Sequence, residues 1–408
     1  MHIITREQYA HQVDAWIGKE QIIVLVGQRR VGKSYIMKDF MMRHQQESDA
    51  NFIYIDKEKI TFKFITNHNE LDDYISQHFV VGKHNYILID EVQDIDGWEH
   101  SVRSFRSEAN TDVIITGSNS KMLSSELSTL LAGRYVQIRV QSLSYQEFMQ
   151  FHKLADSDET LFRYLSYGGL PGLCNIDLDN DNMIWEYLSG IFNTIMLKDV
   201  IERHNVRNIT FLNNFISFLA DTIGKLNSFS SITKYMKSQG EEISIKVIQS
   251  YYTYFAETFL TTYVPRYDIH CKKLLDTTGK TYFGDIGLRN FIIGGEREND
   301  IEKVIENVVY QHLIRLGYNV TIGQLRAGEI DFVCTQTTSH STYHNKVYVQ
   351  VSYIIANDET REREFGALCN IHDAYPKYVI SATPLIRTSD YKGIKHLGLR
   401  HFLQNGFN

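Results

Sequence analysis

The residues best suited to chemistry form one short run, Gly27-Gln28-Arg29-Arg30-Val31-Gly32-Lys33-Ser34. Its glycines let backbone N–H groups approach a phosphate, Lys33 brings positive charge to the β- and γ-phosphates, and Ser34 brings a hydroxyl to Mg²⁺. The run follows the apolar, β-branched segment 21–26 and precedes a helical pattern over 33–42. An ordinary strand-to-helix turn is the alternative, but this order favours a phosphate-binding loop of residues 27–34, continued by Tyr35.

A pair of acidic residues ends a second apolar run, Tyr86-Ile87-Leu88-Ile89-Asp90-Glu91. A strand that ends in aspartate places a carboxylate opposite the phosphate loop, where it holds Mg²⁺ through the water shell of the ion. The following glutamate is placed to orient or deprotonate the attacking water. The alternative is a buried strand with a capping acidic pair. We predict Ser34 and Asp90 as metal-side residues, Lys33 and Glu91 as catalytic residues, and ATP with Mg²⁺ as the ligands.

The elements that must position these residues are five short apolar runs, separated by polar or helical stretches long enough for crossovers. The runs are residues 21–26, 51–55, 86–90, 112–116 and 135–140. Strands joined by crossovers form a parallel sheet covered on both faces, so residues 1–150 are predicted to form an α/β domain. Thr5 and Gln8 have capping-box spacing and predict a helix before the first strand.

The rest of the chain predicts three further domains. Residues 151–207 show a helical pattern, interrupted by a turn at 167–172. Residues 208–297 contain three short helical patterns followed by two strands, an order that resembles a winged helix-turn-helix. Residues 298–408 begin with a helix and continue with strands near 319–322, 330–335, 346–351 and 377–380, as expected for a small α/β domain.

The totals of the chain restrict the class of protein. Its 408 residues exceed one ordinary hydrophobic core, and 43% hydrophobic with 22% charged residues is typical of globular protein. A formal net charge of −7 gives no general attraction for nucleic acid. The four cysteines stand singly, which favours buried free thiols over a zinc site or disulfides. No stretch approaches 18 uncharged apolar residues, so we expect a cytoplasmic protein without a membrane segment.

Together, these motifs resemble those of prokaryotic AAA-type ATPases that carry a winged helix and a C-terminal nuclease-like domain of unknown function. The resemblance spans nearly the whole chain, because further motifs follow in order: Leu88-Ile89-Asp90-Glu91, Thr116-Gly117-Ser118, Gly133-Arg134, Leu143-Ser144-Tyr145-Gln146-Glu147-Phe148, Tyr167-Gly168-Gly169-Leu170-Pro171 and Glu329-Ile330-Asp331-Phe332-Val333. It implies a five-stranded, AAA/ASCE-type P-loop NTPase sheet, ATP hydrolysis, and a PD-(D/E)XK-like C-terminal domain.

Four residues outside the two main motifs have candidate roles. Ser118 and Asn119 follow the fourth strand, where a polar side chain senses the γ-phosphate or simply forms a turn. Arg134 stands where AAA-type ATPases often place an arginine at the subunit edge. It is therefore either a finger that acts in trans within a homo-oligomer or part of a surface salt bridge. Gly169-Leu170-Pro171 looks like a motif that contacts the nucleotide base, which makes Pro171 a nucleotide-binding candidate and the winged helix a lid.

The C-terminal segment matches the PD-(D/E)XK nuclease layout only in part. Glu306 is expected on a helix and Asp331 at a strand end, and in that layout carboxylates in these places bind Mg²⁺. In the next strand Gln350 stands in place of the second acid, and Ser352 in place of the lysine. Serine cannot supply the positive charge of a lysine. The site is therefore predicted to be inactive unless Lys346 or another group takes over, and the domain to serve as a binding module.

These patterns lead to one leading function and two alternatives. The leading hypothesis is a slow ATPase that acts as a molecular switch, whose ATP or ADP state sets the posture of the winged helix and is read by an unidentified protein partner. The alternatives are an ATP-regulated, Mg²⁺-dependent nuclease and a DNA-binding regulator. In the latter, lysines of the winged-helix region touch phosphates, although neighbouring glutamates dilute their charge. The lysines are Lys234, Lys237, Lys246, Lys272 and Lys273, and the glutamates are Glu241, Glu242 and Glu257.

Overall fold

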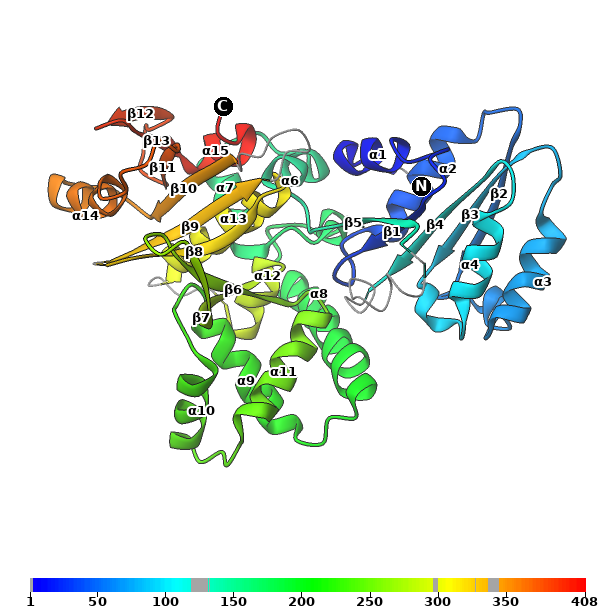
Figure 1. Ribbon diagram of the computed structural model, residues 1–408, viewed down its shortest axis with the longest axis horizontal. Coiled ribbons are helices and arrows are strands. Elements are labelled where there is room, and N and C mark those ends of the chain that lie inside the picture. Colours follow the sequence, from blue (N-terminus) through cyan, green and yellow to red (C-terminus); the bar gives the residue numbers. More distant parts are fainter. Residues whose placement is uncertain (1–2, 119–130, 132, 296–299, 327, 337–344) are drawn as a thin grey trace. The chain divides into compact units, whose positions relative to one another are not determined.

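The structure, a computed structural model, describes residues 3–118, 131, 133–295, 300–326, 328–336 and 345–408 (Figure 1). The γ-phosphate candidate Asn119 lies outside these residues. The chain divides into two compact units. The first comprises Met1–Ser142 with Glu257–Phe259, and the second comprises Leu143–Ala256 with Leu260–Asn408. Within the described ranges, no helix is long and apolar enough to cross a membrane.

The first unit contains a five-stranded, all-parallel sheet with the order β2-β3-β4-β1-β5. The strands are β1 (Ile22–Val26), β2 (Ala50–Asp56), β3 (His84–Asp90), β4 (Thr111–Gly117) and β5 (Tyr135–Arg139). The five predicted strands and their parallel arrangement are confirmed. The pairing of β2 with β3 sets Asp56 beside Asp90, and β4 lies between the strands that end in the phosphate loop and in Asp90.

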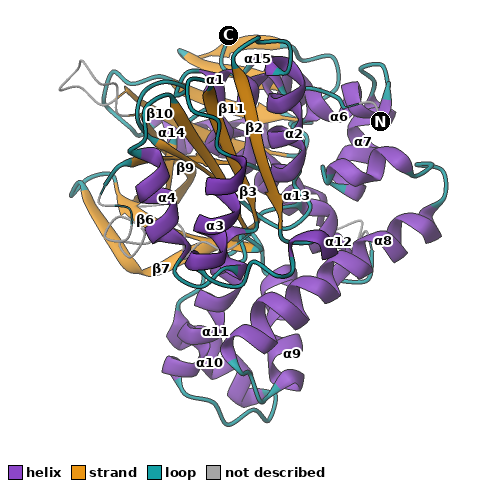
Figure 2. Cartoon of the chain, turned by 90° about the vertical axis from the view of Figure 1, so that its right-hand side faces the viewer, coloured by secondary structure: helices purple, strands orange, loops and turns teal. Residues whose placement is uncertain are grey.

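Helices cover both faces of this sheet, and Figure 2 shows the arrangement from the side. They are α1 (Glu7–Asp14), α2 (Lys33–His44), α3 (His68–His78) and α4 (Trp98–Arg106), with the short 3-10 helices η1 (Ile60–Phe62) and η2 (Val92–Asp94). Alternate strand residues such as Ile53 and Ile87 pack with α3 and α4 in one buried core. The opposite face meets α2, where the Phe40 ring lies 5.3 Å from that of Tyr86.

The capping box predicted at the first helix is wrong. The helix itself is present as α1, but its N-cap is Arg6, which makes no side-chain capping bond. The hydroxyl of Thr5 instead donates to Asp39 Oδ1 on α2 at 2.6 Å. A buried carboxylate on a neighbouring helix therefore takes the hydroxyl that the local pattern assigned to the helix end.

The second unit begins with helices. They are α6 (Tyr145–His152), α7 (Asp158–Tyr167), η4 (Pro171–Asn175), α8 (Asp181–Thr194), the π-helix η5 (Ile195–Glu202), α9 (Ile209–Asp221), α10 (Phe229–Ser238) and α11 (Ile245–Glu257). The three helices expected between residues 208 and 260 are confirmed as α9, α10 and α11. Two strands follow them, β6 (Thr261–Asp268) and β7 (Lys273–Phe283). The interpretation of this group as a winged helix stays a prediction.

A single eight-stranded sheet, with the order β12-β13-β11-β10-β9-β8-β6-β7, runs through the second unit. The remaining strands are β8 (Asn319–Leu325), β9 (Gly328–Gln336), β10 (Asn345–Ser352), β11 (Lys377–Ser381), β12 (Thr388–Tyr391) and β13 (Ile394–Gly398). The remaining helices are α12 (Ile286–Ile292), α13 (Ile301–Arg315), α14 (Asp358–Cys369) and α15 (Leu399–Asn405). Because β6 pairs in parallel with β8, the hairpin after α11 shares its sheet with the C-terminal strands. The predicted four-part division stays a prediction.

The four cysteines are free thiols, as expected from their spacing. Their predicted burial is wrong for two of them. Cys334 of β9 is buried, whereas Cys271 in the β6–β7 connection and Cys369 at the end of α14 are exposed. A cysteine in a connection or at the end of a helix can therefore be exposed, although its side chain is apolar.

Gly27 has no room for a side chain. Its φ is +154°, and an added Cβ would lie 2.1 Å from the carbonyl oxygen of Val140. Gly82 is the matched control, because its φ of +87° is also positive but no atom lies within 4 Å of an added Cβ. We expect Gly27→Ala to lower the free energy of unfolding by about 1–3 kcal/mol more than Gly82→Ala does, measured by denaturant titration. Equal losses in the two variants would contradict the close contact.

Candidate functional site

The phosphate loop runs from the end of β1 to the start of α2. Gly32, with φ +97°, is the N-cap of α2, and Lys33 opens the helix. Lys33 is only 5% exposed, and its ammonium donates to the carbonyl oxygens of Gly27 at 2.9 Å and Gln28 at 3.0 Å. The loop is therefore wrapped around its own lysine at the helix N-terminus, where backbone N–H groups favour an anion.

Ser34 and Asp90, the two predicted metal-side residues, lie together. Asp90 is 2% exposed, and burial is the main reason that its pKa is raised. Glu91 and Asp56 raise the pKa of Asp90 further, whereas hydrogen bonds from Thr116 and Ser34 oppose the rise. The hydroxyl of the loop thus meets the carboxylate at the end of β3, which is the arrangement that a magnesium ion with a water shell requires.

Glu91 lies beside the loop lysine. Burial works to raise the pKa of Glu91, but Lys33, Gln93, Arg29 and Ser118 together hold it below its ordinary range. The residue adopts a left-handed backbone with φ +56°. It is therefore an ionised carboxylate at neutral pH, held in a strained position next to a buried ammonium group.

Thr116 links the two acidic residues, a role that the sequence did not reveal. Its fully buried hydroxyl donates to Asp90 Oδ1 at 2.5 Å and accepts the backbone N–H of Glu91 at 2.9 Å. The residue belongs to the polar end of β4 that was predicted to lie between the two motifs. The sequence does not show which residue of this end faces the carboxylates. The pairing of β4 with β3 in the structure places Thr116 there.

Arg6 holds the far side of the loop. It is 6% exposed, and its Nη1 donates to the carbonyl oxygens of Val31 and Gln141, both at 2.9 Å. Its guanidinium also lies over the Tyr9 ring, 4.5 Å from the centroid. No motif marks this arginine in the sequence, because its partners are backbone carbonyls more than 20 residues away.

The remaining loop residues differ in their exposure. Arg30 and Tyr35 are exposed, and Arg30 has a left-handed backbone with φ +65°. Val31 is buried, while Gln28 is buried with a side-chain amide that makes no hydrogen bond. The predicted contacts of these residues with nucleotide stay predictions.

Arg134 is exposed at the sheet edge opposite the phosphate loop. Its carbonyl oxygen accepts the N–H of Ile22 at 3.1 Å, at the beginning of β1, whereas the loop follows the end of that strand. One strand of five residues separates the two edges, roughly 16 Å at 3.3 Å per residue. Arg134 is therefore too far from the loop of its own chain, and its role in trans stays a prediction.

Pro171 opens η4 in the second unit. The glycine turn before it is fixed by Asp285 at the N-cap of α12, whose Oδ2 accepts the N–H of Gly169 at 2.9 Å. The carbonyl oxygen of Gly169 accepts the N–H of Leu143 at 2.6 Å. These contacts show how the turn is held, and the predicted contact of Pro171 with a nucleotide base stays a prediction.

Three of the residues predicted for a nuclease-like site, Glu306, Asp331 and Gln350, lie together, with an unexpected addition. Lys280 of β7 bridges Glu306 and Asp331. Gln350 accepts the N–H of Asp331 at 3.3 Å. Ser352 is buried. The predicted substitute Lys346 instead lies over the rings of Tyr267 and Tyr375, at 5.3 and 5.2 Å. The nuclease-like assignment of the fold stays a prediction.

The basic side chains of the predicted winged helix are accessible. Lys234 and Lys237 on α10, Lys246 on α11, and Lys272 with Lys273 in the β6–β7 hairpin are all exposed. Their contact with DNA stays a prediction.

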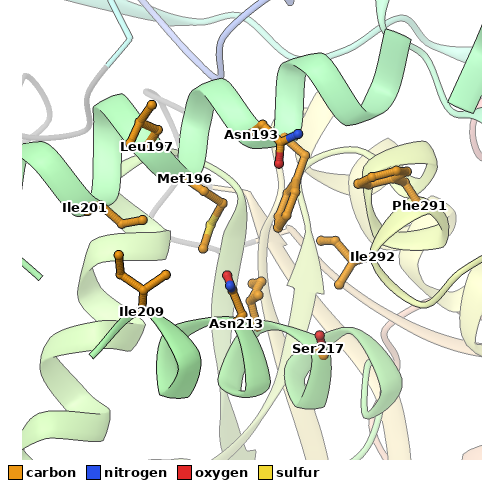
Figure 3. A pocket seen from close by; sticks show the side chains of 11 residues that line it. Asn193, Met196, Leu197, Ile201, Ile209, Asn213, Ser217, Phe291 and Ile292 are labelled. Carbon is orange, nitrogen blue, oxygen red and sulfur yellow. The ribbon is translucent and has the colours of Figure 1, made fainter. Parts of the chain in front are cut away.

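A separate pocket of about 480 Å³ lies in the second unit, between the end of α8, the π-helix, α9 and α12 (Figure 3). Its walls are mainly apolar side chains such as Phe192, Met196 and Phe291, and its polar groups are the neutral Asn193, Asn213 and Ser217. No charged side chain lines it. Phosphates need cationic or backbone N–H donors, so this pocket does not suit a nucleotide.

Removing the Thr116 hydroxyl tests its link between the acidic residues. Thr116→Val leaves the buried N–H of Glu91 without an acceptor, and we expect a loss of about 1–3 kcal/mol in the free energy of unfolding. The pKa of Asp90 rises further without its donor, so protonated Asp90 is favoured and the variant loses additional stability as the pH rises through that pKa. Urea titrations across pH measure both effects. Thr116→Ser keeps the hydroxyl and should behave as the wild type does.

Two regions of the chain match family models. Residues 19–149 match a family described as an AAA domain. This match includes the phosphate loop, Asp90 and Glu91. Residues 158–299 match a family described as a domain of unknown function (DUF8612).

The chain is also similar to two uncharacterized proteins and to a solved structure over most of its length. An uncharacterized protein of Haemophilus influenzae is 34% identical over 387 residues, which cover 93% of each chain. An uncharacterized protein of Methanocaldococcus jannaschii is 28% identical, covering 85% of this chain and 78% of its own. Among solved structures, a Walker-type ATPase of Pyrococcus abyssi matches with a TM-score of 0.50 at 15% identity, covering 71% of this chain and 96% of that one. At this identity the likeness concerns the fold.

Proposed function

Because the chain belongs to the AAA-type P-loop ATPase family, we propose that it binds ATP at residues 27–35, hydrolyses it slowly, and acts as a nucleotide-dependent switch. Two interactions carry the proposal. The hydroxyl of Ser34 hydrogen-bonds the carboxylate of Asp90, and the positive charge of Lys33 lowers the pKa of Glu91. A hydroxyl, an ammonium group and two carboxylates with separate environments are the groups that phosphoryl transfer to water requires.

The side chains divide the work of binding and hydrolysis. Lys33 and the loop N–H groups bind the β- and γ-phosphates, and Ser34 with Asp90 would hold Mg²⁺ directly or through water. When bound, the ion neutralises charge that develops on the phosphate oxygens. Glu91 is ionised at neutral pH and orients the attacking water. Thr116 keeps the two carboxylates in register with each other.

Two features of Glu91 support the proposal of slow hydrolysis. A carboxylate whose pKa is held below its ordinary range is a weak proton acceptor, which lowers its efficiency as a general base. The side-chain amide of Gln93 also donates to Glu91 Oε2. A long-lived ATP state suits a switch better than a motor, because the partner has time to respond.

The output of the switch is proposed to be the second unit. In this proposal Pro171 contacts the nucleotide base, the winged-helix region changes posture with ATP or ADP, and a protein partner reads the change. A nuclease-like C-terminal fold serves as the binding module. Contact of the exposed lysines with DNA is a further role for the same region.

Lys33→Ala tests the nucleotide site. We expect ATP affinity to fall by roughly 30-fold or more, as when one partner of a buried charge contact is removed. Lys83→Ala, at an exposed lysine of the same unit outside the loop, is the matched control and should bind as the wild type does. Glu91→Gln should keep the affinity and lower the rate of hydrolysis by about 100-fold or more. Retained ATP affinity in Lys33→Ala, measured by titration calorimetry, would refute the site.

Mixing inactive variants tests a finger in trans. We expect Arg134→Ala alone and Lys33→Ala alone to hydrolyse ATP poorly, and their mixture to recover activity. The recovery arises because a Lys33→Ala subunit offers its arginine to the intact loop of an Arg134→Ala subunit. A mixture of Lys33→Ala with Glu91→Gln is the control, since both changes damage the same site. Full activity of Arg134→Ala would instead assign this arginine to the surface.

A further inference from the structure

A buried lysine stands at the centre of three carboxylates in the second unit. Lys280 is 3% exposed, and its Nζ lies 2.9 Å from Glu306 Oε1, 2.8 Å from Glu329 Oε1 and 3.0 Å from Asp331 Oδ1. Glu306 belongs to α13, and the other two belong to β9. Carboxylates from two elements therefore converge on one ammonium group, which a third element, β7, supplies. We call the three carboxylates the carboxylate cage.

Other contacts orient the cage without the lysine. The hydroxyl of Tyr282 donates to Glu306 Oε1 at 2.5 Å, and the backbone N–H of Val351 donates to Asp331 Oδ2 at 2.9 Å. Two of the three carboxylates are thus fixed by donors of their own, as the ligands of a cation site are fixed by a second layer of hydrogen bonds.

The cage carries more negative charge than Lys280 neutralises. Three carboxylates and one ammonium group leave a formal charge of −2 when all are ionised. Burial raises the pKa of Glu306 to about 7 despite the opposing effect of Lys280. Burial would lower the pKa of Lys280, but the three carboxylates hold it well above its ordinary value, so the ammonium group keeps its proton. An ion pair needs one carboxylate, whereas this excess of carboxylate is typical of a site for a cation.

The oxygens surround Nζ at hydrogen-bond distances, which are longer than the bonds of a metal ion to its ligands. Ca²⁺ takes carboxylate oxygens at about 2.3–2.6 Å, so oxygens now 2.8–3.0 Å from Nζ need to close by roughly 0.5 Å. As they stand, no three His, Cys, Asp or Glu side chains in the described part of the chain are arranged to hold a metal. We propose that the ammonium group of Lys280 is the resident cation of the carboxylate cage and closes it to divalent metal ions.

This role explains why the C-terminal motif departs from a nuclease pattern. With Lys280 inside the cage, a metal ion has no place from which to activate a water molecule. Lys346 lies among aromatic rings and does not compensate for the charge, and Gln350 is engaged with the backbone of Asp331. The cage then fixes α13 to the sheet and takes no part in hydrolysis.

Lys280→Met tests the proposal, because methionine keeps an unbranched side chain and removes the charge. We expect this variant to bind one Ca²⁺ per chain about tenfold or more tightly than the wild type, measured by titration calorimetry without nucleotide. Adding Asp331→Asn to Lys280→Met should abolish the gain, which assigns the ion to the cage. Lys234→Met, at an exposed lysine of α10, is the matched control and should bind Ca²⁺ as the wild type does.

Two results would overturn the proposal. One is Ca²⁺ binding by the wild type that is lost on Asp331→Asn, since the cage would then be open with Lys280 present. The other is a folded Lys280→Met variant that gains no Ca²⁺ affinity. Removing the cation from a buried cluster strains the fold, so circular dichroism is recorded first. If Lys280→Met does not fold, the double variant Lys280→Met with Glu306→Gln is tested in its place, because it buries one negative charge less. The same gain in Ca²⁺ affinity is expected of it, and the absence of that gain would again overturn the proposal.

Discussion

Two adjacent carboxylates are buried at the end of β3, and the first unit is arranged to make that burial tolerable. Asp90 receives hydroxyl donors, and its pKa is nevertheless raised, whereas Glu91 faces an ammonium group and its pKa is lowered. Neighbouring acids in opposite environments are suited to different tasks. One is matched to an ion and its water, and the other to a water molecule that attacks phosphate.

The sheet order creates these environments. β4 lies between β1 and β3, so the polar end of β4 reaches the acidic pair while the loop approaches from the other side. Arg6, the N-cap of α1, also holds the loop by hydrogen bonds to the carbonyl oxygens of Val31 and Gln141. The site is therefore a property of four strand ends and one helix N-terminus, and the loop motif supplies only part of it.

The sequence predicted well those features that depend on local pattern. The glycine-lysine-serine run, the strand ending in Asp90 and the five parallel strands each follow from short-range spacing. Thr116, Arg6 and Lys280 were not predicted, because their partners are brought near by strand register or by distant backbone carbonyls. The capping box at Thr5 failed for the same reason, since a buried aspartate on another helix competed for the hydroxyl.

The parallel pairing of β6 with β8 affects any fragment of the second unit that lacks the β6–β7 hairpin. In a fragment that starts at α13, β8 would be an edge strand, and the N–H and C=O groups that pair with β6 would be free to pair with other chains. The C-terminal strands thus need the hairpin after α11 as a protective cover. Shuffling this module between proteins, or expressing it by itself, would require that hairpin to travel with it.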